Sequence, residues 1–313
     1  MSTTIALKVF SKVTRLMGNR FEISVVAEDE QQAANAIEKA IAEIQRIEKL
    51  LTTFDASSQT NQINEQAGIK PVAVDREVFD LIERSLKISR LTQGAFDITY
   101  GSLDKSLWNF DTQMKSLPQP GDAKWAVKRI DYRNILLNKE DQTVFISQSG
   151  TRIGFGGIGK GYAADRAKQV LQQSAVANGI VNASGDLTVW GTQPDGKNWT
   201  VGIADPQHKH MPFASLELKD ASIATSGNYE KFVIIDGKKY SHNIDPRTGY
   251  PVHGIKSTTI ICKSAELADA MATPITVMGV KNGLYLIDQL KDIACIIIDD
   301  HDQVFHSKNI KLS

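Results

Sequence analysis

The pattern of apolar and polar residues predicts one strand and two helices near the N-terminus. The segment 21–27, FEISVVA, is rich in β-branched and aromatic residues, which is typical of a strand. From Asp29 onward, apolar residues recur every three or four positions, and this spacing predicts a helix of about 22 residues with one buried face. The buried face consists of Ala33, Ile37, Ala40, Ile41, Ile44, Ile47 and Leu51. A second helix is expected over 76–93, because Asp75 is a candidate N-cap and Gly94 follows the end.

After residue 130 the pattern changes to short apolar runs that are typical of strands. Strands are expected at 133–138, 143–147, 151–155, 179–184, 187–190, 199–204, 222–225, 231–235, 257–262 and 293–298. Helices are expected at 160–175 and 264–278. Because helices dominate the early part of the chain and strands the later part, the pattern predicts an α+β fold.

Two polar segments, 57–68 and 111–122, are expected to be loops, and the second is the best candidate for an internal linker. A chain of 313 residues with 42% hydrophobic residues is long enough for a large core. We therefore expect a single domain over 1–313, with a subdivision near 111–130 as the alternative.

Charge and composition exclude several classes of protein. Lys and Arg number 36, as do Asp and Glu, so no basic excess favours a nucleic acid as partner. No run reaches the roughly 18 apolar residues of a transmembrane segment, and none is expected. The N-terminus lacks the apolar core of a secretory signal, which predicts a cytoplasmic protein, or an exported or membrane-anchored one if a leader has been removed. Cys262 and Cys295 lie in apolar runs and are expected to be buried thiols.

The segment 151–167, TRIGFGGIGKGYAADRA, is the first candidate for chemistry. Glycines allow the backbone to approach a ligand closely, and the following helix N-terminus offers free N–H groups to an anion such as phosphate. Residues 154–160 match the start of a P-loop, but Gly161 stands where Ser or Thr would hold Mg²⁺. Gly154, Gly156 and Gly159 match the dinucleotide-binding pattern, but no acidic residue follows at the required distance. The segment therefore predicts phosphate binding by neither standard fold.

Two loops carry further polar side chains. The turn 184–186, Ser-Gly-Asp, follows a strand and presents Asp186 either as a ligand contact or as part of a plain turn. In the segment 238–251, KKYSHNIDPRTGYP, His242 can move a proton near neutral pH, and Asp245 can orient the imidazole or bind a cation. An Asp-Gly hairpin signal at 236–237 is expected to bring Thr225, Ser226 and Gly227 near His242.

The segment 263–279, KSAELADAMATPITVMG, predicts a helix with a cation site. Asp269 and Thr273 are four residues apart and therefore share one face of the helix. Their carboxylate and hydroxyl oxygens suit Mg²⁺, a hard cation. Pro274 cannot donate a backbone hydrogen bond and is expected to kink the helix. The alternative is a capped surface helix whose Asp269 faces water.

Several motifs, in this order, give the chain a specific resemblance: RLMGNRFEI, TTFDASSQTNQIN, GAFDITYGSL with Trp108, IGKGYAAD, SGDL, ATSGNYE, HNIDPRTG and ADAMATPITVMG. From about Leu16 to its end, the chain resembles the ApbE family, the FAD:protein FMN transferases. The resemblance implies an α+β flavin-binding fold with mixed, largely antiparallel sheets and flanking helices. It also implies FAD as substrate and Mg²⁺ as cofactor. Members of the family transfer FMN from FAD to a Thr or Ser hydroxyl of a target flavoprotein and release AMP.

The resemblance also assigns roles to individual residues. The expected FAD-binding residues are Met17, Phe54, Ala95, Phe96, Asp97 and Lys160, and we expect Asp186, Thr225, Ser226 and Gly227 to complete the cofactor site. The expected metal ligands are the carbonyl of Gly157 with Asp269 and Thr273, and His242 matches a position needed for transfer. Two departures stand out. Gly154 occupies a position where the family usually has Asp, which predicts the loss of one acidic FAD contact, and Ser184 replaces the first Gly of a Gly-Gly-Asp motif.

The expected function is therefore Mg²⁺-dependent transfer of FMN from FAD to a protein hydroxyl. In this hypothesis, the glycine amides and Lys160 hold the pyrophosphate, His242 accepts the proton of the acceptor or positions it, and Asp245 steers the imidazole ring. Three alternatives remain at this point. They are a Mg²⁺-dependent FAD pyrophosphatase that forms FMN and AMP, a non-catalytic flavin-binding protein, and a P-loop nucleotide kinase, against which Gly161 argues.

Overall fold

The computed structural model describes residues 6–104, 115–204, 212–227 and 232–310. Across these ranges, the largest sheet has eight strands in the order β1-β2-β6-β7-β10-β14-β15-β16, and every neighbouring pair is antiparallel. The strands are β1 Lys8–Leu16, β2 Asn19–Ala27, β6 Gly179–Ala183, β7 Asp186–Trp190, β10 Ala221–Gly227, β14 Ile255–Cys262, β15 Ile293–Asp299 and β16 Val304–His306. The predicted α+β class is confirmed.

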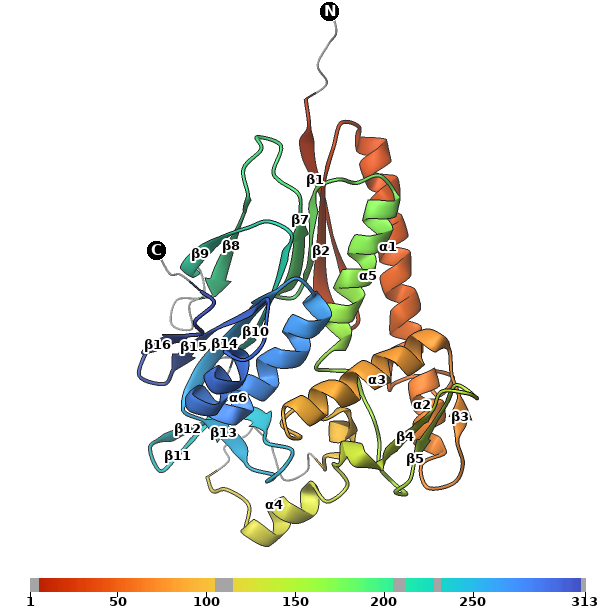
Figure 1. Ribbon diagram of the computed structural model, residues 1–313, viewed down its shortest axis with the longest axis vertical. Coiled ribbons are helices and arrows are strands. Elements are labelled where there is room, and N and C mark those ends of the chain that lie inside the picture. Colours follow the sequence, from red (N-terminus) through yellow and green to blue (C-terminus); the bar gives the residue numbers. More distant parts are fainter. Residues whose placement is uncertain (1–5, 105–114, 205–211, 228–231, 311–313) are drawn as a thin grey trace, which may run out of the picture.

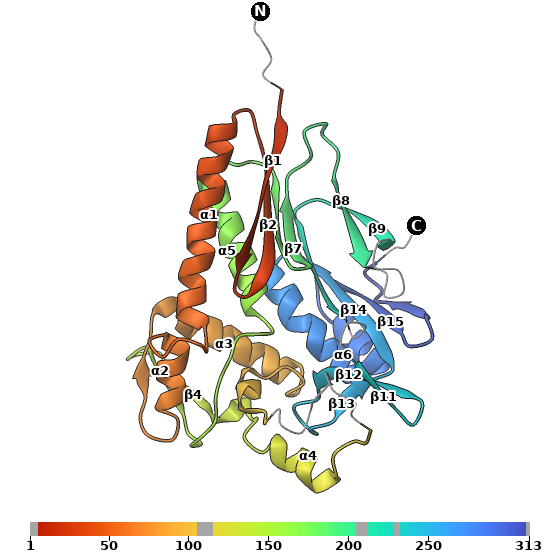
Figure 2. The ribbon, with the colours of Figure 1, turned by 180° about the vertical axis from the view of Figure 1, so that it is seen from behind.

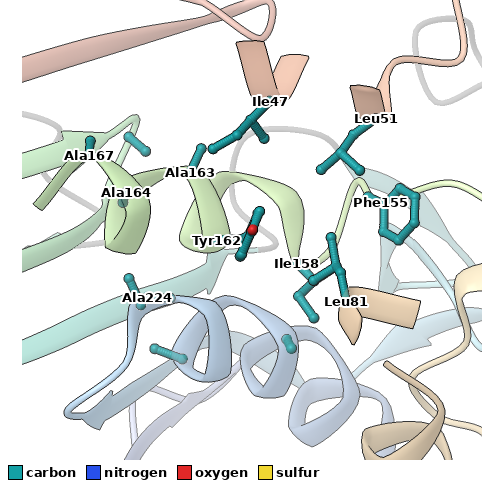
Figure 3. Close-up of a cluster of buried hydrophobic side chains, with 14 of the residues drawn as sticks. Ile47, Leu51, Leu81, Phe155, Ile158, Tyr162, Ala163, Ala164, Ala167 and Ala224 are labelled. Atoms are coloured by element: carbon teal, nitrogen blue, oxygen red, sulfur yellow. The ribbon is translucent and has the colours of Figure 1, made fainter. Parts of the chain in front are cut away.

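Three helices cover one face of this sheet (Figure 1), namely α1 Glu30–Leu51, α5 Gly159–Gln173 and α6 Ala265–Ile287. The hairpin of β8 Trp199–Ala204 and β9 Pro212–Leu218 packs on the opposite face, where Trp199 and Val201 meet Leu187 and Val189. Helix α5 lies between α1 and α6, and most of its buried residues are glycine or alanine, with Tyr162 and Leu171 as the larger ones. Figure 3 shows Ala163, Ala164 and Ala167 among the larger side chains of the neighbouring helices. These alanines allow the three helices to pack closely.

Smaller elements form the lower part of the molecule in Figure 1. They are α2 Gln59–Glu65, α3 Arg76–Leu91, the 3₁₀-helices η1 Ile98–Ser102 and η3 Tyr132–Asn134, and α4 Pro120–Ala126. One three-stranded sheet consists of β3 Val72–Ala73, β4 Ile135–Asn138 and β5 Thr143–Ile146, and the other of β11 Phe232–Ile235, β12 Lys238–Ile244 and β13 Pro251–His253. Figure 2 shows these elements from behind, where α4 lies below β13.

Helix α1 follows the prediction closely. It has 22 residues, its N-cap is Asp29, whose carboxylate accepts the N–H of Gln32 at 2.7 Å, and all seven predicted apolar residues are buried. An ion-pair network joins α1 to its neighbours, because Glu43 accepts hydrogen bonds from Arg46 and from Arg166 of α5. The hydrogen bonds from Arg46 lower the pKa of Glu43 the most, and those from Arg166 lower it further. Together they outweigh burial, which would raise the pKa, and bring it to about 2.

This network makes stability depend on pH. The folded-state pKa of Glu43 is about 2 and lies below its ordinary value of 4.5. Its ionised form therefore stabilises the fold above about pH 4.5, and this stability is lost as the pH falls through about 2. At pH 7, Glu43→Gln is expected to lower the free energy of unfolding by about 1–2 kcal/mol. Urea unfolding should show that the difference from wild type shrinks as the pH is lowered from 5 toward 2.

The matched control for this prediction is Glu38→Gln on the same helix. Glu38 forms a surface ion pair with Lys12, and both side chains are about half exposed. Its loss is expected to cost less than about 0.5 kcal/mol at any pH. A Glu43→Gln effect that is equally large at pH 7 and pH 3 would contradict the proposed linkage.

The structure corrects several of the expected boundaries. The expected loop 57–68 contains α2, whose N-cap Ser58 accepts the N–H of Asn61. Residues 111–114 of the expected linker lie outside the described residues, and its last residues begin α4 at Pro120. Helix α6 extends to Ile287, and its backbone departs from helical geometry at Gly279 (φ +80°) rather than near Pro274.

Two other expectations can be compared with the structure directly. Cys262 and Cys295 are buried free thiols, as predicted. Over the ranges that the structure covers, no helix combines the length and the apolar character needed to span a membrane.

Candidate active site

A large pocket of about 870 Å³ lies at the C-terminal end of α1 and the N-terminal end of α5, beside the middle of α6. Five segments that are far apart in the sequence supply most of its walls: 17–19, 51–54, 95–101 without Thr99, 152–157, and 243–246 without Asp245. Glu48, Lys160, Thr273 and Pro274 complete the lining. A pocket of this size is suited to a ligand as large as a dinucleotide.

The wall formed by 17–19 is the turn between β1 and β2. Leu16 pairs with Asn19, so Met17 and Gly18 form a two-residue hairpin loop, with φ angles of +50° and +72°. Positive φ at both positions is the signature of a type I′ turn, which matches the twist of the strands. The side-chain amide of Asn19 donates to the carbonyl of Met17 at 2.7 Å and stabilises the turn. The hairpin therefore holds Met17 at the pocket.

Phe54 and Phe96 are the aromatic residues among the predicted FAD contacts. Phe54 follows the end of α1 and is 99% exposed, so its ring is free to stack on a planar ligand. Phe96 is buried beside Gly157, with a ring carbon 3.6 Å from the position that a Cβ on Gly157 would take. Ala95 lies next to it in the same wall. The pocket thus combines an exposed aromatic ring at its edge with a buried one inside.

Asp97 also lines the pocket, but its carboxylate has structural partners. One oxygen accepts hydrogen bonds from the N–H and hydroxyl of Thr99, and the other accepts the N–H of Tyr132 at 2.8 Å. Burial nevertheless raises the pKa of Asp97, because it outweighs these hydrogen bonds. Asp97 caps η1 and joins it to η3, so the wall 95–101 depends on this side chain.

The glycine-rich segment is not the strand that the sequence predicted for 151–155. The N–H and C=O of Ile153 bond the side-chain amide of Asn64 on α2, at 2.7 and 3.0 Å. The N–H of Arg152 donates to the hydroxyl of Ser102, and the N–H of Gly154 donates to the carbonyl of Ile98. Because side chains and η1 satisfy these backbone groups, the segment needs no neighbouring strand and runs along the pocket as an irregular chain.

Gly161 explains why the P-loop pattern fails in this chain. A Cβ at this position would lie 2.1 Å from the carbonyl oxygen of Ala265 and 2.8 Å from the Cβ of Asp269. Ser or Thr is therefore excluded where α5 and α6 meet. The close approach also lets the N–H of Gly161 donate to Oδ2 of Asp269 at 3.0 Å. The glycine thus positions a buried carboxylate against the N-terminus of α5.

Lys160, Asp186 and Asp269 form a cluster of charged side chains at the end of the pocket next to the N-terminus of α5, and both carboxylates are buried. Lys160 forms an ion pair with Asp186, and both lie near Asp269. Burial and then the charge of Asp186 raise the pKa of Asp269 to about 7, although Lys160 opposes the shift. Burial also raises the pKa of Asp186, against the effect of Lys160. Burial alone would lower the pKa of Lys160, but the two carboxylates outweigh it and raise the pKa.

When all three groups are ionised, the cluster carries one excess negative charge. An uncompensated buried charge is costly, so the cluster favours either a bound proton or a cation near Asp269. Within the described part of the chain, no group of three or more His, Cys, Asp or Glu forms a metal site. The predicted donors are instead one carboxylate, the hydroxyl of Thr273 one helical turn later and a backbone carbonyl. This oxygen-only set fits a hard cation such as Mg²⁺.

The loop after β12 forms another part of the site. Asp245 binds the guanidinium of Arg247 through both carboxylate oxygens, at 2.9 and 2.8 Å, and also accepts the N–H of Arg247. His242 is exposed on β12, next to the lining residue Asn243. The side chain of Asn243 donates to the hydroxyl of Ser226 at 3.4 Å. The steering of His242 by Asp245 stays a prediction, whereas the role of Asp245 in closing the turn is visible.

The predicted site residues fall into two groups. The pocket lining contains Met17, Phe54, Ala95, Phe96, Asp97, Gly157, Lys160 and Thr273. Outside the lining lie Asp186, Thr225, Ser226, Gly227, His242, Asp245 and Asp269. Of these, Asp186 contacts Lys160, Ser226 contacts Asn243, and Asp269 contacts Gly161. The side chain of Thr225 pairs with Thr259 on the neighbouring strand at 3.0 Å, and its backbone N–H bonds the carboxylate of Asp186.

Sequence reasoning did not single out several polar residues that line the pocket, and Arg152 and Asn243 are two of them. Arg152 precedes the glycines, and its guanidinium donates to Oδ1 of Asn61 on α2 at 3.1 Å. Asn243 directly follows His242. Arg152 lies in the glycine-rich segment 151–167 and Asn243 in the segment 238–251, and these positions could have pointed to a role in binding. The residue types themselves, Arg and Asn, do not indicate a site.

The antiparallel sheet with its helical layer and this pocket define an α+β protein of the flavin-transferase type. The chain belongs to the ApbE family, whose model matches residues 17–297. The predictions of family and fold class are both confirmed.

Relatives and solved structures agree with this assignment. The FAD:protein FMN transferase of Klebsiella pneumoniae is 31% identical over 97% of this chain and 94% of its own length. That of Treponema pallidum is 31% identical over 88% of this chain and 80% of its own length. The ApbE protein of Thermotoga maritima superposes with a TM-score of 0.84 at 30% identity, covering 96% of this chain and 97% of its own. The class of enzyme predicted from the sequence is the class of these relatives.

Proposed function

We propose that this protein transfers FMN from FAD to a Thr or Ser hydroxyl of a target flavoprotein and releases AMP. The observation that carries the proposal is the buried cluster of Lys160, Asp186 and Asp269 at one end of a pocket large enough for a dinucleotide. The family membership and the names of the relatives support it. The exposed ring of Phe54 offers a stacking surface for a flavin or an adenine.

The pyrophosphate of FAD is the ligand group that fits this end of the pocket. The ammonium of Lys160 attracts its negative charge, and the glycine segment 154–157 lets the backbone approach the phosphates. Asp269, Thr273 and the carbonyl of Gly157 would hold Mg²⁺, which would neutralise charge on the phosphoryl oxygens and polarise the phosphorus. Asp186 keeps Lys160 charged and fixes its position.

The transfer step is a displacement at the phosphorus of the FMN half. The acceptor oxygen forms a bond to this phosphorus, the bond to the bridging oxygen breaks, and AMP leaves with that oxygen. The acceptor hydroxyl loses its proton in the reaction. In our proposal, His242 accepts this proton or positions the hydroxyl, since it lies beside the lining residue Asn243. The hydrogen bonds between the guanidinium of Arg247 and the carboxylate of Asp245 stabilise the turn that follows His242.

Replacing His242 tests this assignment. His242→Ala is expected to lower FMN transfer at least about hundredfold, because general base catalysis contributes factors of this order. The readout is the mass increase of a Thr-containing target protein incubated with FAD and Mg²⁺. His253→Ala is the matched control, since that exposed histidine lies on β13 outside the pocket lining. Full modification of the target by His242→Ala would remove His242 from the mechanism.

The same incubation separates transfer from hydrolysis. AMP and FMN that appear at the same rate without any target protein would indicate a pyrophosphatase. Bound FAD without any AMP would indicate a non-catalytic flavin-binding protein. The proposed transferase is expected to release AMP in proportion to the FMN that becomes bound to the target.

A further inference from the structure

The exposed face of α4 carries a cluster of aromatic and cationic side chains that the proposed transfer chemistry does not use. Trp125 is 54% exposed, and the ammonium of Lys128 lies 4.3 Å from the centre of its ring. Lys124 is exposed on the same face. Among the residues that the structure describes, no carboxylate pairs with either lysine. We call Lys124 and Trp125 of α4, together with Lys128 in the turn that follows it, the α4 face.

The opposite side of α4 is packed against the wall of the pocket. Ala126 and Val127 form a small apolar cluster with Ile244, against which Tyr100 also packs. Tyr100 and Ile244 are themselves lining residues of the pocket. Helix α4 and the pocket thus share this wall.

A second contact fixes α4 to the loop that carries Asp245. A Cβ at Gly249 would lie 2.2 Å from the carbonyl oxygen of Ala123, so the loop and the helix meet backbone to backbone. The hydroxyl of Tyr250 donates to the carbonyl of Pro118 at 3.5 Å. The α4 face is therefore held firmly beside the residues proposed to receive the acceptor hydroxyl. Figure 1 shows α4 below β13 and to its right.

We propose that the α4 face is the docking surface for the target flavoprotein, and that it binds an acidic segment next to the modified Thr or Ser. This inference rests on the proposed function, because it names the partner of the same site. A partially exposed tryptophan is a typical anchor of protein interfaces, and unpaired lysines beside it select a partner of opposite charge. Because the inner side of α4 packs on Tyr100 and Ile244, a segment bound to the α4 face would lie one helix away from the pocket wall.

The experiment uses two fluorescein-labelled peptides with one central Thr, the first flanked by Asp and Glu and the second by Lys. Fluorescence anisotropy at low salt measures docking on the full protein without FAD, and mass spectrometry after addition of FAD and Mg²⁺ measures transfer. The acidic peptide is expected to bind wild type more tightly than the basic one. Lys124→Glu combined with Lys128→Glu, and separately Trp125→Ala, should each weaken this binding at least about fivefold.

Matched controls separate docking from general effects of charge or folding. Lys39→Glu combined with Lys70→Glu reverses two exposed charges elsewhere, and Tyr285→Ala removes another exposed aromatic ring. Neither control should change binding by more than about twofold. Binding of FAD without any peptide should stay unchanged in all variants, since the α4 face lies outside the pocket lining.

Several outcomes would overturn the docking proposal. They are equal binding of the acidic peptide to wild type and to the α4 variants, no binding to wild type, or a preference for the basic peptide. Because Trp and Lys are also frequent at membrane surfaces, vesicles of phosphatidylglycerol are tested in parallel. Loss of vesicle binding in the α4 variants with unchanged peptide binding would assign the face to a membrane instead. If the docked peptide gains no FMN, the proposed function fails while the docking result stands.

Discussion

Replacing Asp269 with asparagine is expected to lower the rate of AMP release from FAD by at least about a hundredfold. The change removes one negative charge from the cluster at the end of the pocket and weakens the attraction for a divalent cation. The side chain keeps its size, and its carbonyl oxygen can still accept the N–H of Gly161, which lies 3.0 Å from Oδ2 in the wild type. The geometry of α5 against α6 should therefore be preserved.

Stability measurements distinguish this loss from simple unfolding. Burial raises the pKa of Asp269 to about 7, which is above its ordinary value of 3.8. A carboxyl whose folded-state pKa is raised costs stability once the unfolded chain ionises, and the cost grows as the pH rises toward the folded-state pKa. Without Mg²⁺ at pH 7.5, Asp269→Asn should therefore unfold at the same temperature as wild type or a higher one. A much lower unfolding temperature would contradict this account.

The raised pKa also predicts how Mg²⁺ dependence varies with pH. A cation binds the ionised carboxylate and competes with the proton. The apparent Mg²⁺ affinity of wild type should therefore increase between about pH 6 and 8 and then level off. Glu266→Gln is the matched control, because Glu266 lies on the same helix but pairs with Arg84 outside the pocket lining. Its AMP release should remain close to wild type, and unchanged turnover in Asp269→Asn would refute the assignment of the metal site.

The periodicity of the sequence was sufficient to predict helices α1, α3, α5 and α6 and most strands of the main sheet. Helix α1 could be predicted because one complete face is apolar and buried against the sheet. Strand β1 escaped notice because it lies at the edge of the sheet, where Val9 and Val13 are 44% and 52% exposed. Apolar residues on one face of this strand are exposed, and Lys12 and Thr14 separate Phe10 from Leu16 on the other, so the strand shows no clear alternation.

The main errors in the predicted secondary structure arose from polar residues that have tertiary hydrogen-bond partners. Helix α2 reads as a loop because its sequence is polar, yet Asn61 and Asn64 are buried there. Asn64 bonds the backbone of Ile153, so it replaces the strand partner that the apolar segment 151–155 would otherwise need. Such a pairing between residues 89 positions apart leaves no local signal in either segment.

The candidate site shows the same division. Asp269, Thr273 and Lys160 could be chosen from residue type and spacing, because a carboxylate and a hydroxyl one turn apart, or a lysine after glycines, indicate chemistry locally. The ion pair of Lys160 with Asp186 depends on how α5 packs on the turn before β7, which no spacing encodes. The raised pKa of Asp269 depends on the same packing. The candidate residues could thus be chosen from the sequence, whereas their electrostatics required the fold.

Gly161→Ala is expected to destabilise the protein more than other single methyl additions in the glycine-rich segment. The added Cβ would lie 2.1 Å from the carbonyl oxygen of Ala265, which belongs to the backbone and cannot rotate away. Helices α5 and α6 would have to separate, and this would break the packing of the buried alanines around them. The expected cost is about 3 kcal/mol or more, which corresponds to a fall in Tm of about 5 °C or more.

Gly156→Ala is the matched control for this prediction, because it adds the same methyl group within the same segment. No atom lies within 4 Å of a Cβ at Gly156, so the change should cost less than about 1 kcal/mol. Thermal unfolding without FAD compares the two variants, since Gly156 also lines the pocket. Equal stability of both would show that α5 and α6 can move apart at little cost. In that case the packing of the helices would not fix Asp269 against the N–H of Gly161. The close approach of the helices could then not explain why Gly161, rather than Ser or Thr, follows Lys160.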